Sequence, residues 1–243
     1  MLNKLESVSI DRCLHFRGFR YGGFSNNPYE DYILGLHIAS SGEGKGKKIR
    51  SNFIDAVLNS RVTSFSSALN ISLEREYAPW IYPWAIRAAF NISSGVLMPQ
   101  SNPDIISHYS PGGVLASHIN REFLWLEQAY DAVSKSGYLP KKFGYITLQP
   151  LKMGNEFRYI VLDGNHRLAS LHALGISEVE AIVKPIKLCS LSRIKLWPGV
   201  VSGRFTLSDA ERIFLRYFEV KNREIESNLR QELVYDESLL VDP

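Results

Sequence analysis

The segment 158–183 constrains the fold more than any other part of this sequence, because its hydrophobic pattern changes period twice. Arg158–Leu162 is a short, β-branched apolar run of strand length. Gly175 later supplies a helix stop, and Val179–Val183 is again apolar and strand-like. The segment is therefore predicted to form strand, tight turn, helix and strand. The helix is indicated by leucines at helical spacing on one face: Leu168, Leu171 and Leu174.

Five polar or permissive residues, Asp163-Gly-Asn-His-Arg167, form the predicted turn. A helix N-terminus has unpaired backbone N–H groups and a partial positive charge, so it favours an anion. Gly164 lets a ligand approach the backbone, His166 donates from a ring nitrogen, and Arg167 offers a fork of donors that matches phosphate oxygens. In the alternative interpretation, Asp163 caps the helix while His166 and Arg167 face solvent. The density of these residues between two apolar runs favours a phosphate site, where Asp163 can hold a metal ion.

The motif Asp163-Gly-Asn-His-Arg-Leu-Ala169, followed by Ala173-Leu-Gly175, resembles the signature of the ParB/sulfiredoxin superfamily. Upstream, Phe123–Pro140 is similar to the helix, glycine and proline that lead into the strand before the turn in that family. The resemblance covers Ser117–Pro185, under a third of the chain. It implies an α+β fold, a small mixed sheet with packed helices that is elaborated by N-terminal and C-terminal additions.

Three chemistries occur in this superfamily, and the turn distinguishes them. Sulfiredoxins have a catalytic Cys at the position of Asn165, so the resemblance argues against sulfinic acid reduction. Chromosome-partitioning members bind CTP and append a helix-turn-helix domain, for which the sequence after Pro185 shows no convincing pattern. The third group resembles free-serine kinases and carries Asp-Gly-His-His-Arg, the version closest to this chain. Asn165 stands here in place of the first histidine of that pair.

The resemblance therefore implies a nucleotide-dependent phosphotransferase or nucleotide hydrolase that acts on a small hydroxyl-bearing acceptor. ATP or ADP, with CTP as an alternative, and Mg²⁺ are the implied cofactors, and Asp163 is the implied metal ligand. The implied catalytic residues are Glu122, Asp163 and His166. Glu122 is included because the kinase-like relatives have a glutamate that acts as the catalytic base near the start of the helix that precedes the turn. The alternative is a nucleotide-gated, ParB-like DNA-binding or partition protein, although DNA is the disfavoured partner. The nucleotide is expected to contact Gly164, Asn165, His166 and Arg167.

Candidate substrate-binding residues lie outside the motif. The segment Arg17–Phe24 alternates cations with aromatic residues and glycines, so Arg17 and Arg20 are candidates for gripping a phosphate. For this segment we favour the other interpretation, in which its aromatic side chains are buried in the core. His118 lies one turn from Glu122 on the same helical face and is a weaker candidate, for which a solvated helix surface is the simpler explanation.

Composition limits the class of protein. The chain has 243 residues and 45% hydrophobic content, so it can bury a sizeable core, and no apolar run reaches the ~18 residues of a membrane span. The first residues lack the apolar core of a signal peptide, and Cys13 and Cys189 have no metal-ligand spacing, so we expect a cytoplasmic protein. The net charge of +3 is too small to indicate nucleic-acid binding by itself.

Three regions are expected along the chain. Residues 1–100 are a family-specific N-terminal region, residues 101–190 are the nucleotide-binding core, and residues 191–243 are a C-terminal helical extension. Other expected elements are a strand or helical turn at Tyr32–Ala39, helices at Ile49–Leu58 and Ser117–Ser136, a strand at Phe143–Leu148, a loop at Pro150–Glu156, and a C-terminal helix that starts at a capping box, Ser208–Glu211, and frays near Asn228.

Overall fold

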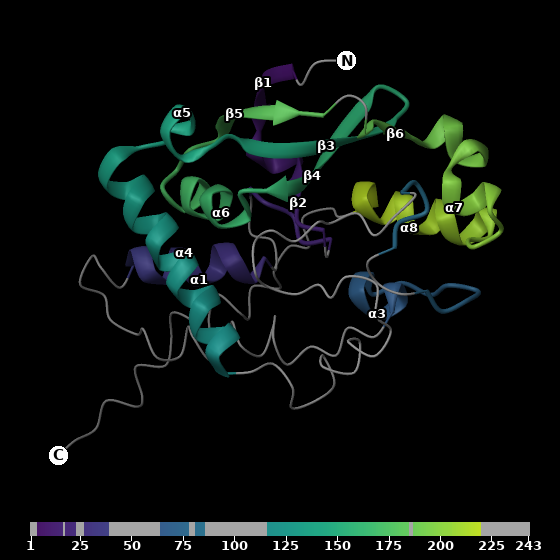
Figure 1. The fold of residues 1–243 in the computed structure, drawn as a ribbon, viewed down its shortest axis with the longest axis horizontal. Coiled ribbons are helices and arrows are strands. Elements are labelled where there is room, and N and C mark those ends of the chain that lie inside the picture. The colour runs from purple at the N-terminus through teal and green to yellow at the C-terminus, as the bar shows by residue number, and fades with distance from the viewer. Residues whose placement is uncertain are drawn as a thin grey trace.

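A computed structural model describes residues 4–16, 18–22, 27–38, 64–77, 81–85, 116–184 and 187–219, with only the backbone for Ala68 and residues 116–122. Within these ranges the chain is an α+β protein with one six-stranded mixed sheet (Figure 1). The α+β class predicted from the sequence is confirmed. No helix in these ranges is long and apolar enough to span a membrane.

The sheet has the order β1-β5-β3-β4-β2, and β6 also pairs with β3. Antiparallel ladders join β1 to β5 and β3 to β4, whereas β3 pairs in parallel with β5 and β6, and β2 pairs in parallel with β4. Strands from the N-terminal residues 4–14 and from residues 146–190 therefore enter one sheet. The strands are β1 (Lys4–Ser9), β2 (Cys13–Leu14), β3 (Ile146–Met153), β4 (Glu156–Asp163), β5 (Glu178–Val183) and β6 (Cys189–Ser190).

Three helices cover one face of the sheet: α1 (Pro28–Ile38), α4 (Ala116–Ser136) and α6 (Asn165–Ala173) (Figure 1). The face is apolar because strand side chains alternate, so that Val179, Ala181 and Val183 of β5 are buried while Glu178 and Glu180 are exposed. Helix α4 packs against this face with a stripe of apolar side chains at helical spacing. The stripe includes Phe123, Leu126 and Val133 of the first hydrophobic cluster.

A second hydrophobic cluster lies at the other end of the sheet and is rich in aromatic side chains. Leu151 of β3 and Ile160 of β4 belong to it, whereas their neighbours Leu148 and Val161 belong to the first cluster. Asp209 is buried at this end, where it accepts hydrogen bonds from Tyr77 Oη at 2.6 Å and from the Glu74 amide at 2.8 Å. The helices here are α3 (Phe65–Leu69), the 3-10 helix η6 (Leu191–Leu196), α7 (Pro198–Val201) and α8 (Leu207–Glu219).

Two predicted boundaries before the turn are wrong. The strand predicted from Phe143 begins at Ile146, because Pro140 starts a short helix, α5 (Pro140–Phe143). The segment after Pro150, predicted as a loop, continues β3 to Met153 before a two-residue turn. Pro150 is tolerated in this central strand because β5 pairs only with residues 146–148 and β6 only with residues 151–152, so its missing N–H falls between the two ladders.

Other boundaries are partly confirmed. The helix predicted at Ser117–Ser136 is α4. Of the segment predicted as strand or helical turn at Tyr32–Ala39, the residues up to Ile38 form the second half of α1, and Ala39 lies outside the described residues. Helix α8 begins one residue before the predicted capping box, because the hydroxyl of Thr206 accepts the Asp209 amide at 3.0 Å. The predicted helix Ile49–Leu58 and the fraying near Asn228 lie outside the described residues. A 3-10 helix, η1 (Ile10–Arg12), completes the described elements.

The first cluster joins two of the predicted regions, and the second cluster joins all three. Val8 and Ile10 belong to the first cluster, together with residues of the region 101–190. The second cluster combines Leu14, residues of the segment 65–84, and residues of η6, α7 and α8. The limits of the predicted regions stay predictions, but their described parts are packed together through the sheet.

Candidate functional site

The predicted turn lies between β4 and α6, as the sequence indicates. Asp163 is the last residue of β4, Gly164 is the N-cap of α6 with φ 94° and ψ 22°, and Asn165 is the first helical residue. A Cβ at Gly164 would lie 2.8 Å from Ile146 Cγ1, so both its conformation and the packing of β3 require glycine. The alternative in which Asp163 is the N-cap is not what the structure shows, since no side chain caps α6.

Arg167 donates to acceptors within the chain. Nη1 donates to the carbonyl oxygens of Phe143, at 3.0 Å, and Gly144, and Nη2 donates to Asp163 Oδ2 at 3.0 Å. The Arg167 side chain is 18% exposed and that of Asp163 is 62% exposed. Arg167 therefore ties the first turn of α6 to the end of α5 and to the end of β4. A ligand phosphate must share this guanidinium with Asp163 and the two carbonyls.

Asn165 is bound by a residue from the N-terminal part of the chain. The hydroxyl of Tyr21 donates to Asn165 Oδ1 at 2.8 Å. Tyr21 is completely buried, and burial raises the pKa of its phenol well above the ordinary value, with nearby Tyr29 acting in the same direction. The phenol is thus a neutral donor, and it holds the oxygen end of the Asn165 carboxamide.

Aromatic rings from two other helices flank His166. The ring of Tyr29, on α1, lies 5.7 Å from the His166 ring, and the ring of Trp125, on α4, lies 6.4 Å from it, measured between centroids. The His166 carbonyl accepts from the hydroxyl of Ser170 at 2.8 Å. The imidazole of His166 is therefore positioned by three helices that meet at the turn.

A third contact joins the N-terminal part of the chain to α6. Glu30 is buried, and its Oε1 accepts from the Gly22 amide at 3.0 Å and lies 2.9 Å from Nδ1 of His172. The hydrogen bond to Glu30 raises the pKa of His172, against the opposing effect of burial. Together, Tyr21, Tyr29 and Glu30 support α6 along its length.

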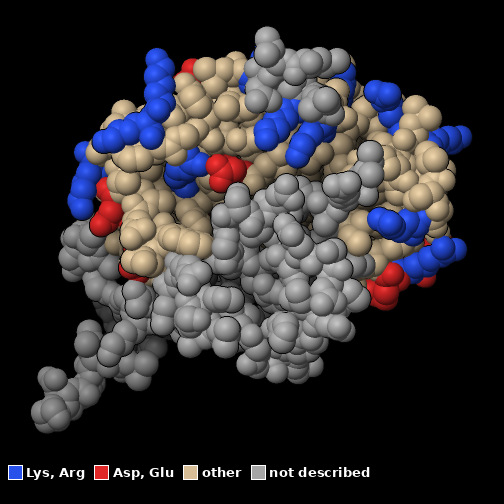
Figure 2. Space-filling model, in the orientation of Figure 1, with Lys and Arg blue, Asp and Glu red and all other residues tan. Residues whose placement is uncertain are grey.

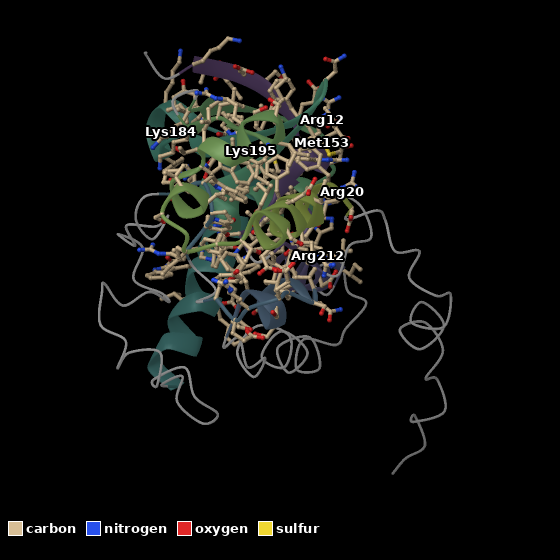
Figure 3. The ribbon with its side chains drawn as sticks, turned by 90° about the vertical axis from the view of Figure 1, so that its right-hand side faces the viewer. Arg12, Arg20, Met153, Lys184, Lys195 and Arg212 are labelled. Carbon is tan, nitrogen blue, oxygen red and sulfur yellow. The ribbon has the colours of Figure 1, made fainter. Side chains whose placement is uncertain are left out.

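The other predicted site residues are not brought to the turn by described contacts. Arg20 Nε donates to the Asp11 carbonyl at 2.8 Å, and Arg158 Nη1 donates to the same oxygen at 3.3 Å. Burial, and then the neighbouring charge of Arg158, lowers the pKa of Arg20. Arg158 is near the start of β4, whereas the turn is at the other end of that strand. Arg20, which shares an acceptor with Arg158, lies with Arg12 and Met153 on one side of the molecule (Figure 3).

Arg17, Glu122 and His118 cannot be placed at the side-chain level. Arg17 lies outside the described residues, and Glu122 and His118 belong to the first turns of α4, where only the backbone is described. Their roles as substrate-binding and catalytic residues stay predictions. In the part of the chain that the structure describes, no three His, Cys, Asp or Glu side chains gather as a metal site would require.

Sequence reasoning missed Tyr21, Tyr29 and Trp125 as neighbours of the turn. Tyr21 was covered only by the general expectation that the aromatic side chains of Arg17–Phe24 are buried, and its burial agrees with that expectation. Its partner Asn165 is 144 positions away, and no local pattern links the two residues.

No protein-family model matches this chain, and no curated protein or solved structure matches it either.

Proposed function

We propose that the chain is a nucleotide-dependent phosphotransferase, or a nucleotide hydrolase, with a ParB/sulfiredoxin-like core and a small hydroxyl-bearing acceptor. One observation carries the proposal: Asn165 and His166 lie side by side in the first turn of α6 and are both fixed from outside the helix. The backbone N–H groups of that turn have no acceptor inside the helix, so donors of three kinds belong to one helical turn.

The donors suit phosphate oxygens. Phosphoryl transfer depends mainly on positioning and on neutralising charge, which requires donors held in place before the ligand binds. The Asn165 amide, the His166 imidazole and the backbone N–H groups meet that requirement. Arg167 adds positive charge while it remains bonded to Asp163 and to α5. Two exposed lysines of α5, Lys141 and Lys142, add further positive charge to the segment that Arg167 contacts.

The residues present fit a nucleotide better than they fit a metal ion held by protein alone. Asp163 is the one carboxylate of the turn, and its Oδ2 is paired with Arg167. Mg²⁺ is often bound by one or two carboxylates together with the phosphates of the substrate. We therefore propose that any Mg²⁺ is held chiefly by the nucleotide, with Asp163 as its protein ligand, and that the ion would supply further neutralisation of phosphate charge.

The described surface gives little support to the DNA-binding alternative. On α8, Arg212 Nη1 donates to the Ser72 carbonyl at 3.0 Å and Arg216 Nε donates to the Leu69 carbonyl at 2.8 Å. These arginines anchor α8 to the end of α3 and to the segment that follows it. Figure 2 shows Lys and Arg scattered over the described part of one face, at its edge and near its middle, with Asp and Glu beside some of them, and the net charge is only +3.

Titration calorimetry with ATP, ADP and CTP, each with and without Mg²⁺, tests the proposal. We expect at least one nucleotide to bind the wild-type protein, and His166→Ala to weaken binding by about tenfold, the effect of losing one hydrogen bond to a charged group. His172→Gln is the matched control and should leave nucleotide affinity unchanged. His172 is on the same helix as His166 but lies at the C-terminal end of α6, where it pairs with Glu30. Equal affinity in His166→Ala and wild type would remove the phosphate site. If the wild-type protein binds no nucleotide but retards DNA in a mobility-shift experiment at moderate salt, the DNA-binding alternative is favoured.

A further inference from the structure

Tyr21 lies between β2 and α1, in a segment that is fixed at both ends. Its amide donates to the Cys13 carbonyl at 3.0 Å, and Arg20 forms a bridge with Leu14 at the end of β2. Its hydroxyl reaches across to α6 and donates to Asn165 Oδ1. The phenol thus comes from an element with no part in the motif of the turn, yet it contacts a residue at the centre of that motif.

Gly22 and Asn27, the next described residues after Tyr21, are equally restrained. Asn27 Nδ2 donates to the Arg20 carbonyl at 3.1 Å, and Asn27 Oδ1 accepts from the Tyr29 amide, also at 3.1 Å. The Gly22 amide donates to buried Glu30. A Cβ at Gly22 would lie 2.7 Å from the backbone of Asp11, so the segment approaches η1 closely. The position of the Tyr21 hydroxyl is therefore set by the fold and needs no ligand.

This position decides how the Asn165 carboxamide is presented. The two ends of a carboxamide are alike in size, but the oxygen accepts while the nitrogen donates two hydrogens. The hydroxyl of Tyr21 donates to the oxygen end of the carboxamide. A phenol oxygen can also accept, but that of Tyr21 is hydrogen-bonded to the side chain of Asn27, which leaves its O–H to donate to Asn165. Nδ2 is then turned away from Tyr21, and no acceptor among the described residues binds it. The two N–H groups of Asn165 remain as donors in the first turn of α6.

We propose that Tyr21 is a positioning residue that acts through Asn165: it orients the carboxamide so that Nδ2 donates to a phosphoryl oxygen of the bound nucleotide. The inference rests on the proposed function and gives the N-terminal part of the chain a defined role in it. That role differs from direct phosphate binding by Arg17 and Arg20, because Tyr21 acts on the ligand only through another side chain.

Tyr21→Phe separates orientation from packing. Phenylalanine keeps the buried ring but removes the hydroxyl, so the Asn165 carboxamide can rotate and present its oxygen to the phosphate. We expect nucleotide affinity to fall by about tenfold, as for a lost hydrogen bond to a charged group. A buried phenol that only packs would lower stability without a specific effect on affinity.

The test is a double-mutant cycle by titration calorimetry with the nucleotide that the wild type binds most tightly. Tyr21→Phe, Asn165→Ala and the double variant are compared with wild type. Both single variants should bind about tenfold more weakly, and Tyr21→Phe should have no further effect once Asn165 is alanine. Tyr82→Phe is the matched control: its buried hydroxyl donates to the Phe16 carbonyl at 2.8 Å in the second cluster, and its loss should leave affinity unchanged.

Three results would overturn the inference while leaving the proposed function in place. The first is a nucleotide affinity in Tyr21→Phe equal to that of wild type. The second is a loss of affinity in the double variant equal to the product of the two single losses, because the two residues would then act independently. The third is a loss of affinity in Tyr82→Phe as large as that in Tyr21→Phe, which would indicate general destabilisation. Failure of the wild type to bind any of ATP, ADP or CTP would instead overturn the proposed function, and this inference with it.

Discussion

At the scale of single residues, the proposed function assigns ligand binding to the turn and proton transfer from the acceptor to a residue outside it. Glu122 is the proposed base, and it lies on α4, outside the turn. A base acts in the transition state, so its removal lowers the rate more than the affinity. We predict that Glu122→Gln binds nucleotide like wild type but turns over about 10²–10⁴-fold more slowly.

Steady-state rates and calorimetric affinities, measured on the same preparation, check this prediction. Asp163→Asn is the comparison, because Asp163 lies in the turn and should change both binding and turnover. Normal turnover in Glu122→Gln would place the base elsewhere, with His118 as the next candidate.

Both cysteines are buried and weakly acidic. Burial raises the pKa of the Cys189 thiol to about 12, against the opposing effect of a hydrogen bond from Gln149, and burial likewise raises the pKa of Cys13. Because the thiolate is the reactive form, we predict that iodoacetamide modifies neither residue at pH 7.5 while the protein is folded. Mass spectrometry before and after denaturation measures this. Rapid labelling of the native protein, or loss of activity on labelling, would show that a cysteine is accessible and important.

At the scale of elements, α6 is held by α1 through one ionisable pair, Glu30 and His172. The pKa of His172 is raised above its ordinary 6.5 in the folded protein. Its contribution to stability is therefore fully present below pH 6.5 and is lost as the pH rises through the raised pKa. We predict that wild type is more stable than His172→Gln at about pH 6 and that this advantage shrinks towards about pH 8.5.

Urea unfolding at several pH values, followed by circular dichroism, measures that difference. The effect should be modest, because His172 is partly exposed and solvent screens the pair. Glu30→Gln should remove the same pH dependence, since Glu30 is the cause of the shift. A stability difference that stays constant with pH would contradict the assignment.

At the scale of the whole molecule, one sheet serves two hydrophobic clusters. Leu148 of β3 and Ile160 of β4 are both fully buried, but they belong to the first and the second cluster respectively. Because the same strands pass through both clusters, we predict that the two unfold together. Leu148→Ala and Ile160→Ala should each cost about 2–5 kcal/mol, and each should shift a single transition.

Far-UV circular dichroism and tryptophan fluorescence should therefore give the same midpoint in every variant. Trp84 and Trp197, the two tryptophans that are buried among the described residues, report on the second cluster directly. Leu34→Ala, at an exposed site on α1, is the control and should change stability by less than about 0.5 kcal/mol. Separate transitions, or a variant that shifts only one probe, would show that the clusters unfold independently.

The sequence by itself determined the local elements around the turn. Change of hydrophobic period, a helix stop and strand-forming residues depend on neighbours within a few positions, so the order of β4, α6 and β5 and the extent of α4 were predictable. The α+β class was predicted from the resemblance of the motif in the turn. Boundaries were wrong where a distant strand decided them, as at Pro150, which lies between the pairings of β5 and β6.

Only the tertiary structure decided what surrounds the turn. The donors of Arg167 are directed to Phe143, Gly144 and Asp163 because α5 ends beside α6 in space, although α5 and α6 are separated by a β-hairpin in sequence. Tyr21 meets Asn165 because β2 joins β4 in parallel and delivers the following segment to α6. Such contacts depend on how strands pair over long separations, whereas sequence patterns report on residues close together in the chain.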